Sequence, residues 1–156
     1  MNYKIILKIL GLLLLLSSAF MALSVLFSLY YNDNDIPSLL ISVGISAGMG
    51  LLLWLSFKKT RTEVGIKEGY LLVSITWVII SLFGALPFYI SGYIPSYTDA
   101  FFETMSGFTT TGASILTDIE SLPHGLLFWR SMTHWLGGMG IIVLSLAILP
   151  FLGIGG

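Results

Sequence analysis

Four long stretches of the chain contain no charged side chain. They cover residues 9–31, 36–57, 69–98 and 131–156. A helix needs roughly 20 apolar residues to cross about 30 Å of hydrocarbon, and a backbone inside lipid must satisfy its own hydrogen bonds. The pattern therefore predicts an all-α integral membrane protein. Its four spanning helices are predicted over about residues 5–30, 36–57, 70–92 and 126–150.

The first stretch also has features of a secretory signal peptide. Lys4 and Lys8 precede the apolar run over residues 10–16, as a charged segment precedes the apolar core of such peptides. The cleavage site is poor, because Phe20 stands where a small residue should lie two positions before Ala22. We therefore interpret this stretch as a spanning helix.

Local signals mark the ends and the irregular points of these helices. Asp35 and Pro37 are suited to cap and begin the second helix, and Gly84 and Pro87 are predicted to kink the third. Three glycines of the fourth would let another helix approach closely, and we interpret them as packing sites rather than as a hinge. They are Gly137, Gly138 and Gly140.

The composition agrees with a membrane protein. Hydrophobic residues make up 56% of the 156 residues and charged residues 10%, whereas an average soluble domain has about 25% charged residues. The net charge of −1 gives no basic patch for nucleic acid. The absence of cysteine excludes a disulfide framework and a thiolate metal site.

The charged residues are sorted by sign between the two ends of the predicted helices. Lys4 and Lys8 precede the first helix, and the loop after the second helix contains Lys58, Lys59, Arg61 and Lys67. The opposite ends carry Asp33, Asp35, Asp99, Glu103, Asp118 and Glu120. Cytoplasmic loops of membrane proteins carry an excess of lysine and arginine. The N-terminus and the loop over residues 58–69 are therefore predicted to lie in the cytoplasm.

The segment between the third and fourth predicted helices is too long and too apolar for a simple external turn. Residues 96–107 are predicted to form a short helix that Thr98 or Asp99 caps. Its apolar face is predicted to contain Phe101, Phe102, Met105 and Phe108. Twelve residues give about 18 Å of helix, which reaches only part-way through a bilayer. We therefore predict a re-entrant segment, which is tolerated where protein or water covers its backbone.

A threonine-rich run, Thr109-Thr110-Thr111-Gly112, follows this short helix. If the helix descends from outside, its C-terminal end brings about half a negative charge to the middle of the membrane. The threonines would then return outward in extended form, and their backbone carbonyls could replace the water of a dehydrated cation. Gly112 can adopt backbone angles that let adjacent carbonyls point toward one axis. The run predicts an ion filter over residues 109–113, although such a composition is also common in ordinary loops.

The other polar side chains of this region have simpler interpretations. Glu103 either pairs with Arg130 or faces water, and Arg130 is expected to extend to the membrane interface. His124 and His134 stand ten residues apart, which is not a common metal-ligand spacing, so no metal site is predicted beyond the transported ion. An intramembrane serine enzyme is disfavoured, because Ser106 lacks the glycine two residues before it that resembles the nucleophile motif of such enzymes.

Two runs of residues surround these features. They are DAFFETMSGFTTTGASIL, over residues 99–116, and LPHGLLFWRSMTHWLGGMGIIVLSLAILP, over residues 122–150. In these runs the sequence resembles the TrkH branch of the Trk/Ktr/HKT potassium transporters. The resemblance implies an N-terminal two-helix transmembrane hairpin with its cytoplasmic loop (1–69) and one helix–re-entrant pore loop–helix repeat (70–156). Within that first pore repeat it implies a pore helix (96–107), a filter (109–113) and an inner helix (126–150).

The resemblance also implies a function and its residues. The chain would contribute one of four selectivity-filter walls of a K⁺ uptake system, with ion contacts from Thr109, Thr110, Thr111 and Gly112. The carbonyls of Thr110 and Thr111 are the principal contacts expected. Potassium is then the transported ion, no cofactor is implied, and the protein is not an enzyme. It would be a multi-pass protein of the cell membrane, inner or plasma.

The partners implied by the resemblance lie beyond this chain. They are the lipid bilayer, the remaining pore repeats, a second copy of the complete protein in a homodimer, and a cytoplasmic nucleotide-binding regulatory subunit with RCK domains. Since the sequence stops at Gly156, just after the first repeat, we expect a portion of a larger transporter that does not conduct selectively by itself. A homotetramer of one-repeat subunits is less favoured, because the filter lacks a TVGYG run. The alternative is a truncated or accessory multi-pass membrane subunit with no transport of its own.

Overall fold

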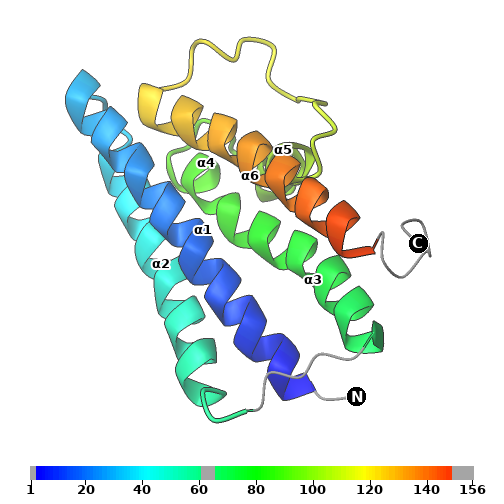
Figure 1. Cartoon of the computed structure of the whole chain (residues 1–156). Helices are drawn as coiled ribbons and strands as arrows, with labels where there is room; N and C mark the ends of the chain where they lie inside the picture. Colours follow the sequence, from blue (N-terminus) through cyan, green and yellow to red (C-terminus); the bar gives the residue numbers. More distant parts are fainter. Residues whose placement is uncertain (1–2, 61–65, 149–156) are drawn as a thin grey trace.

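The computed structural model describes residues 3–60 and 66–148 of the chain, and Figure 1 shows that this part is built of helices. No strand occurs within those two ranges. The helices are α1 (Tyr3–Tyr31), α2 (Ile36–Ser56), α3 (Ile66–Gly84), α4 (Leu86–Ile90), α5 (Tyr97–Phe108) and α6 (His124–Ile148). The all-α fold predicted from the apolar stretches is confirmed.

Three helical segments are long and apolar enough to cross a membrane, among the residues that could be searched. They are α1, α2 and the segment Glu68–Ile90, which joins most of α3 to α4. The helix α6 has 25 residues and is therefore about 37 Å long at 1.5 Å per residue. Its length suffices for a span, but most of its side chains after Gly140 lie outside the described residues. The fourth span therefore stays a prediction.

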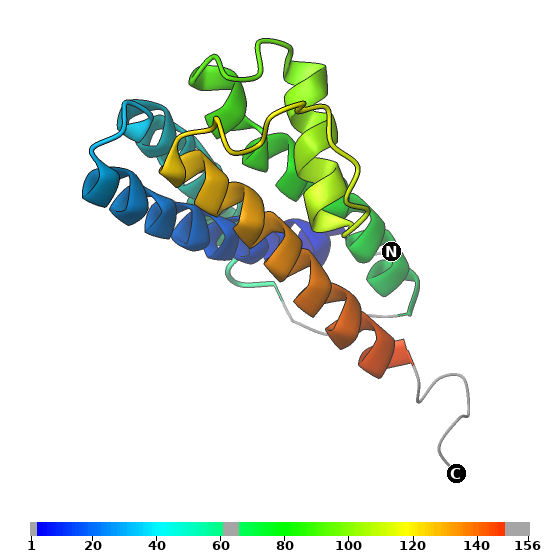
Figure 2. The ribbon, with the colours of Figure 1, turned by 90° about the horizontal axis from the view of Figure 1, so that it is seen from above.

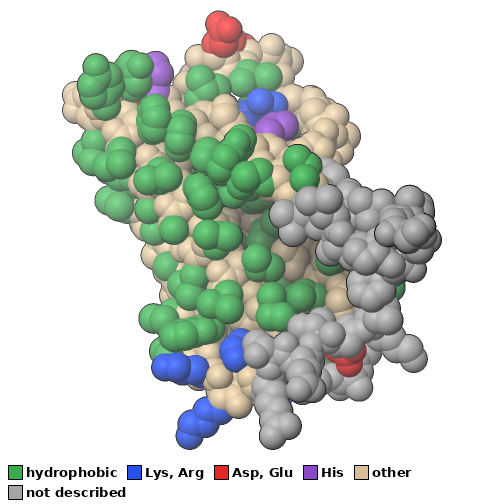
Figure 3. All heavy atoms as spheres, in the orientation of Figure 1, with side chains coloured by type: hydrophobic (Ala, Val, Ile, Leu, Met, Phe, Trp, Pro, Cys, Tyr) green, Lys and Arg blue, Asp and Glu red, His purple; other side chains and the backbone are tan. Residues whose placement is uncertain are grey.

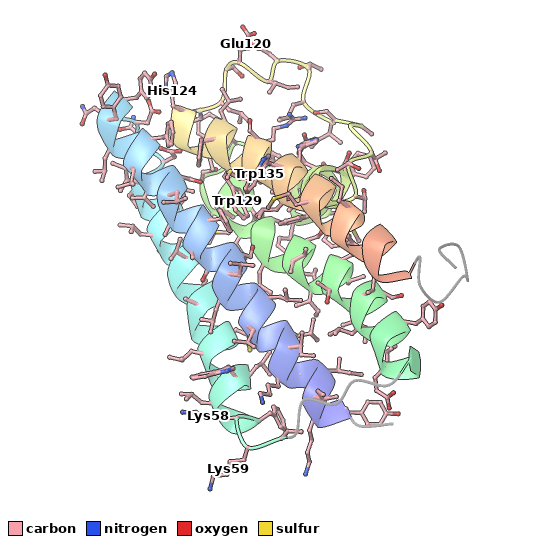
Figure 4. The ribbon with its side chains drawn as sticks, in the orientation of Figure 1. Lys58, Lys59, Glu120, His124, Trp129 and Trp135 are labelled. Carbon is pink, nitrogen blue, oxygen red and sulfur yellow. The ribbon has the colours of Figure 1, made fainter. Side chains whose placement is uncertain are left out.

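The exposed lysines after α2 and the acidic loop residue Glu120 lie at opposite ends of the long helices (Figure 4). Lys58 and Lys59 lie at one end of the molecule, and Glu120 and His124 lie at the other (Figure 4). Hydrophobic side chains cover the surface between these ends on the face shown in Figure 3. A membrane-spanning bundle requires this distribution, because its middle meets hydrocarbon and its ends meet water.

The helices α1 and α2 form a hairpin with close contact at two glycines (Figure 1). A Cβ atom at Gly11 would lie 2.8 Å from the carbonyl oxygen of Gly50, and one at Gly50 would lie 2.9 Å from that of Gly11. Asp35 occupies the N-cap position of α2 and Pro37 its first turn, as predicted. The predicted capping bond is wrong, however, because the Asp35 side chain makes no cap hydrogen bond to α2 and binds other groups instead.

A break at Ala85 divides the predicted third helix into α3 and α4. It lies between Gly84 and Pro87, where the sequence predicts a kink, and proline lacks the amide that a continuous helix would use. The indole Nε1 of the fully buried Trp129 donates a hydrogen bond to the Gly84 carbonyl at 2.9 Å. This bond fastens the break to α6.

Candidate functional site

The short helix α5 begins at a well-defined cap. Ser96 is its N-cap residue, with an extended backbone (φ −91°, ψ 123°), and its side chain accepts a hydrogen bond from the amide of Asp99 at 3.4 Å. The prediction that Thr98 or Asp99 caps the helix is therefore wrong, because both residues already lie within α5 and Ser96 takes the N-cap position. The phenol of Tyr97 donates to the carbonyl of Leu82 at 2.8 Å. Partial burial raises the pKa of Tyr97 above its ordinary value of 10.0, so the phenol remains a donor.

The other end of α5 lies near the middle of the bundle. Its last residue, Phe108, lies against Gly137, near the midpoint of the 25-residue helix α6, and a Cβ atom at Gly137 would overlap the Phe108 carbonyl group. The chain then returns to the beginning of α6 at His124 (Figure 2). This descent and return confirm the predicted re-entrant geometry.

The buried face of α5 is made of small and polar residues as well as apolar ones. It consists of Ala100, Glu103, Thr104, Ser106, Gly107 and Phe108. The four residues predicted to share an apolar face differ in burial, since Phe108 is 2% exposed and Phe102 is 46% exposed. Small residues are needed because the neighbouring helices lie close: a Cβ atom at Gly107 would overlap the Thr133 hydroxyl of α6, and one at Gly84 would lie 2.8 Å from the Thr104 methyl group.

The first two threonines of the run end α5 instead of starting an extended segment. The amide of Thr110 donates to the carbonyl of Gly107, and the amide of Thr111 donates to that of Ser106, each at 2.9 Å. Thr110 has a φ of 56°, the left-handed conformation that completes this type of C-terminal cap. A β-branched residue in this conformation is strained by about 1–2 kcal/mol. The predicted extended return is therefore wrong at Thr109 and Thr110, because both residues belong to the turn that ends α5.

Three consecutive carbonyl groups after the cap accept no hydrogen bond from the described part of the chain. They belong to Thr110, Thr111 and Gly112, all of which are exposed. The carbonyls on either side are occupied: that of Thr109 accepts from the Thr110 hydroxyl at 2.7 Å, and that of Ala113 accepts from the Ser106 hydroxyl at 2.6 Å. Gly112 has a φ of 78° and open space around its Cα atom. Unbonded oxygens beside the negative end of a helix are suited to hold a cation.

A buried carboxylate holds the returning chain. Glu103 on α5 has a side chain only 1% exposed, and the guanidinium Nε of Arg130 on α6 donates to it at 2.7 Å. The carboxylate also accepts from the Ser114 hydroxyl and from the amide of Ile115, both at 3.0 Å. Of the two predictions for Glu103, the pairing with Arg130 is therefore confirmed. The prediction that Arg130 extends to the interface is wrong, because its side chain is 15% exposed and paired.

Two observations disfavour other cation sites among the described residues. Within the described residues, no group of three His, Cys, Asp or Glu side chains could hold a metal ion. A cavity of about 500 Å³ lies between α1, α3 and α6 beside Phe108, and its walls are almost entirely apolar. Apolar walls cannot replace the hydration shell of an ion. The candidate site is therefore the loop after α5.

The sequence predicted the Thr/Gly run and the pairing of Glu103 with Arg130, but not two serines that hold the loop. The Ser106 hydroxyl donates to the Ala113 carbonyl, and the Ser114 hydroxyl donates to the Glu103 carboxylate. The pair could be predicted because Glu103 and Arg130 stand on helices on either side of the same loop. Charged side chains at such positions are usually paired with one another.

Known proteins match this chain over its whole length. A family model for TrkH, described as a cation transport protein, matches residues 37–156. The Trk system potassium uptake proteins TrkH of Halomonas elongata and of Escherichia coli K12 are each 43% identical to the chain over 157 residues. These matches cover 100% of this chain but 33% and 32% of those two proteins.

The same likeness is found in three dimensions. The crystal structure of the potassium transporter TrkH from Vibrio parahaemolyticus matches with a TM-score of 0.90 and 40% sequence identity. The match covers 100% of this chain and 34% of that one. The chain thus spans about a third of the length of the relatives it matches. On the family model, which matches well over half of its residues, the chain belongs to the TrkH family of cation transport proteins.

Proposed function

We propose that the loop after α5 is one of four walls of a potassium-selective filter in a Trk-type K⁺ uptake system. The carbonyls of Thr110 and Thr111 contact the ion in this proposal, and Thr109 and Gly112 complete the wall. One observation carries the proposal: three adjacent carbonyl groups, free of hydrogen bonds from the described residues, lie at the end of a half-length helix midway along α6.

The physical argument concerns the cost of removing water from an ion. A ring of backbone carbonyls can replace the hydration shell of K⁺, and the C-terminal end of α5 adds about half a negative charge. The nearby carboxylate of Glu103 is already paired with Arg130. The wall can therefore attract a monovalent cation without binding it as tightly as a free carboxylate would.

The same proposal gives the parts of the chain their roles and orientation. Residues 1–69 form the transmembrane hairpin with its cytoplasmic loop, and residues 70–156 form one pore repeat. The protein lies in the cell membrane, inner or plasma, with its N-terminus in the cytoplasm. The separation of Lys58 and Lys59 from Glu120 supports this orientation (Figure 4), because basic loops stay inside. In this orientation α5 descends from the outer surface.

The remaining components are proposed from family membership. The relatives named as Trk system potassium uptake proteins are about three times as long as this chain, and we assign the other three filter walls to further pore repeats. The complete transporter is then a homodimer that binds a cytoplasmic nucleotide-binding subunit with RCK domains. Its activity is ion movement, without an enzymatic reaction and without a cofactor.

The test is a chimera in which this chain replaces the matching third of the Escherichia coli TrkH protein. The chimera should restore growth at low K⁺ to a strain without K⁺ uptake. The change Gly112→Ser should then lower the K⁺/Na⁺ permeability ratio at least several-fold, because serine disfavours the φ of 78° at this position.

A matched control separates the filter from general backbone strain. Gly92 also has a positive φ, of 79°, and open space around it, but lies in the turn after α4. Gly92→Ser should leave the permeability ratio unchanged. A chimera that is expressed and keeps its selectivity with Gly112→Ser would contradict the proposed function.

A further inference from the structure

The helix α6 lacks a capping side chain of its own. It begins at His124, directly after Pro123, and its first turn contains no acidic residue. The first amides of a helix need acceptors from outside the helix, and two of them find acceptors in the turn between α1 and α2. The carboxylate of Asp33 accepts from the amide of His124 at 2.7 Å, and that of Asp35 accepts from the amide of Leu126 at 3.0 Å. In each of these two hydrogen bonds, the donor and acceptor residues are 91 positions apart in the sequence.

The Asp35 side chain is surrounded by residues of α1 and α6 at this contact. It is 2% exposed, and its carboxylate also accepts a hydrogen bond from the Ser28 hydroxyl of α1. A Cβ atom at Gly125 of α6 would lie 2.6 Å from an Asp35 carboxylate oxygen and 2.8 Å from the Cβ atom of Ser28. The turn of the hairpin therefore fits the start of α6 because residue 125 has no side chain. A carboxylate at this place is stabilised by the amides and by the positive end of the helix.

The contact continues along the two helices in a fixed register. Three aromatic pairs join α1 to α6: Tyr31 with His124, Phe27 with Phe128, and Phe20 with Trp135. The ring centroids are 3.8, 3.9 and 6.0 Å apart. The steps of four and seven residues on α6 equal those on α1 in the reverse direction, so the two helices are antiparallel and cannot slide without breaking all three pairs. His124 and Trp135 mark the ends of this zone on α6 in Figure 4.

The residues of α6 that hold the filter loop lie in or beside the same zone. Arg130, which binds Glu103, stands between Phe128 and Trp135. Gly137, which receives the end of α5, follows two residues after Trp135. A shift or rotation of α6 relative to the hairpin would therefore move the groups that position the loop.

We propose that Asp33 and Asp35 are positioning residues for the ion filter: they fix the start of α6, and α6 in turn fixes Glu103 and the loop after α5. This inference rests on the proposed function of that loop. It gives the hairpin a role in selectivity, beyond that of a separate membrane anchor.

The experiment uses the chimera described above, purified and reconstituted into liposomes, with two readouts. Hydrogen exchange of the amides of residues 124–127 reports the cap, and the K⁺/Na⁺ permeability ratio reports the filter independently of the amount of folded protein. Asp35→Ala should speed exchange of these amides at least tenfold and lower the permeability ratio several-fold. Gly125→Ala, which leaves both carboxylates in place but displaces the turn, should do the same.

A milder series keeps the test valid if these variants fold poorly. Asp33→Ala removes the less buried carboxylate, whose side chain is 21% exposed, and should give a smaller change in the same direction. Asp35→Asn keeps an acceptor for Leu126 and should retain most of the wild-type ratio. The controls are Gly44→Ala, in open space on the same hairpin, and Asp118→Asn, on the exposed loop, and neither should change either readout.

The outcomes separate this inference from the proposed function. A wild-type chimera that does not discriminate K⁺ from Na⁺ would overturn the filter assignment itself. A selective wild type whose ratio stays unchanged in Asp33→Ala, Asp35→Ala and Gly125→Ala, while exchange at residues 124–127 increases, would overturn the positioning role alone.

Discussion

Glu103 and Arg130 form the charged pair of the re-entrant region, and both are largely withdrawn from solvent. A buried pair of this kind contributes little net stability compared with well-packed apolar residues, but removal of one partner leaves an unpaired buried charge. The pair therefore contributes more to the position of the loop after α5 than to the stability of the fold. The carboxylate accepts from Ser114 and Ile115 in addition to Arg130, so one side chain joins α5, α6 and the returning loop.

Variants of this pair should separate stability from function. Glu103→Gln should lower the free energy of unfolding in detergent by about 3–5 kcal/mol, because Arg130 then remains charged and unpaired. The double change Glu103→Met with Arg130→Met should recover much of that loss, measured by thermal or denaturant unfolding. Its K⁺/Na⁺ selectivity in the chimera should stay impaired, because Ser114 and Ile115 have lost their acceptor. A double variant that is both stable and fully selective would show that the pair does not position the loop.

At the scale of elements, apolar length predicted the long helices, and cap and face patterns predicted the short one. The second helix was predicted over residues 36–57 and spans Ile36–Ser56, and the short helix was predicted over 96–107 and spans Tyr97–Phe108. Both are set by local properties, namely the extent of apolar sequence and the residues that flank it. The break at Ala85 was predicted for the same reason.

Contacts between distant elements could not be predicted in this way. The use of Asp35 by α6 rather than by α2 depends on a partner 91 residues away. The conformation of Thr110 also depends on its neighbours, since its own β-branched side chain disfavours a φ of 56°. The residues of the loop were recognised by their order, but their backbone followed the end of α5 rather than an extended strand.

Neighbouring glycines of α6 give a direct test of packing between elements. A Cβ atom at Gly137 would overlap the backbone of Phe108, whereas one at Gly138 would have its nearest neighbour, the Thr110 methyl group, 3.9 Å away. Gly137→Ala should therefore destabilise the protein by about 1–3 kcal/mol through overpacking. Gly138→Ala should be neutral or should stabilise α6 by up to about 1 kcal/mol through helix propensity.

The measurement is the midpoint of unfolding in detergent for each single variant. Equal destabilisation by the two changes would contradict packing as the role of Gly137 and would favour a hinge, where the flexibility of both residues is needed.

For the whole molecule, the placement of the lysines at one end predicts how the helices are oriented in the membrane. The hairpin turn with Asp33 and Asp35, the start of α6 and Glu120 share one end, and Lys58 and Lys59 lie at the other (Figures 1 and 4). If the lysine end is cytoplasmic, the re-entrant helix α5 enters from the outer surface. The negative end of its dipole then lies in the membrane, and the cap on α6 faces the outside.

The absence of cysteine in the chain allows this orientation to be measured with single introduced thiols. Lys59→Cys and Glu120→Cys lie at opposite ends, and both positions are exposed. In intact cells a membrane-impermeant maleimide should label the Glu120→Cys variant, and it should label Lys59→Cys only after the membrane is permeabilised. The reverse pattern would place the C-terminal end of α5 toward the outer surface, so that an ion arriving from outside would first meet the lysine end. That result would contradict both the orientation and the direction of approach to the loop after α5 that the proposed uptake of K⁺ requires.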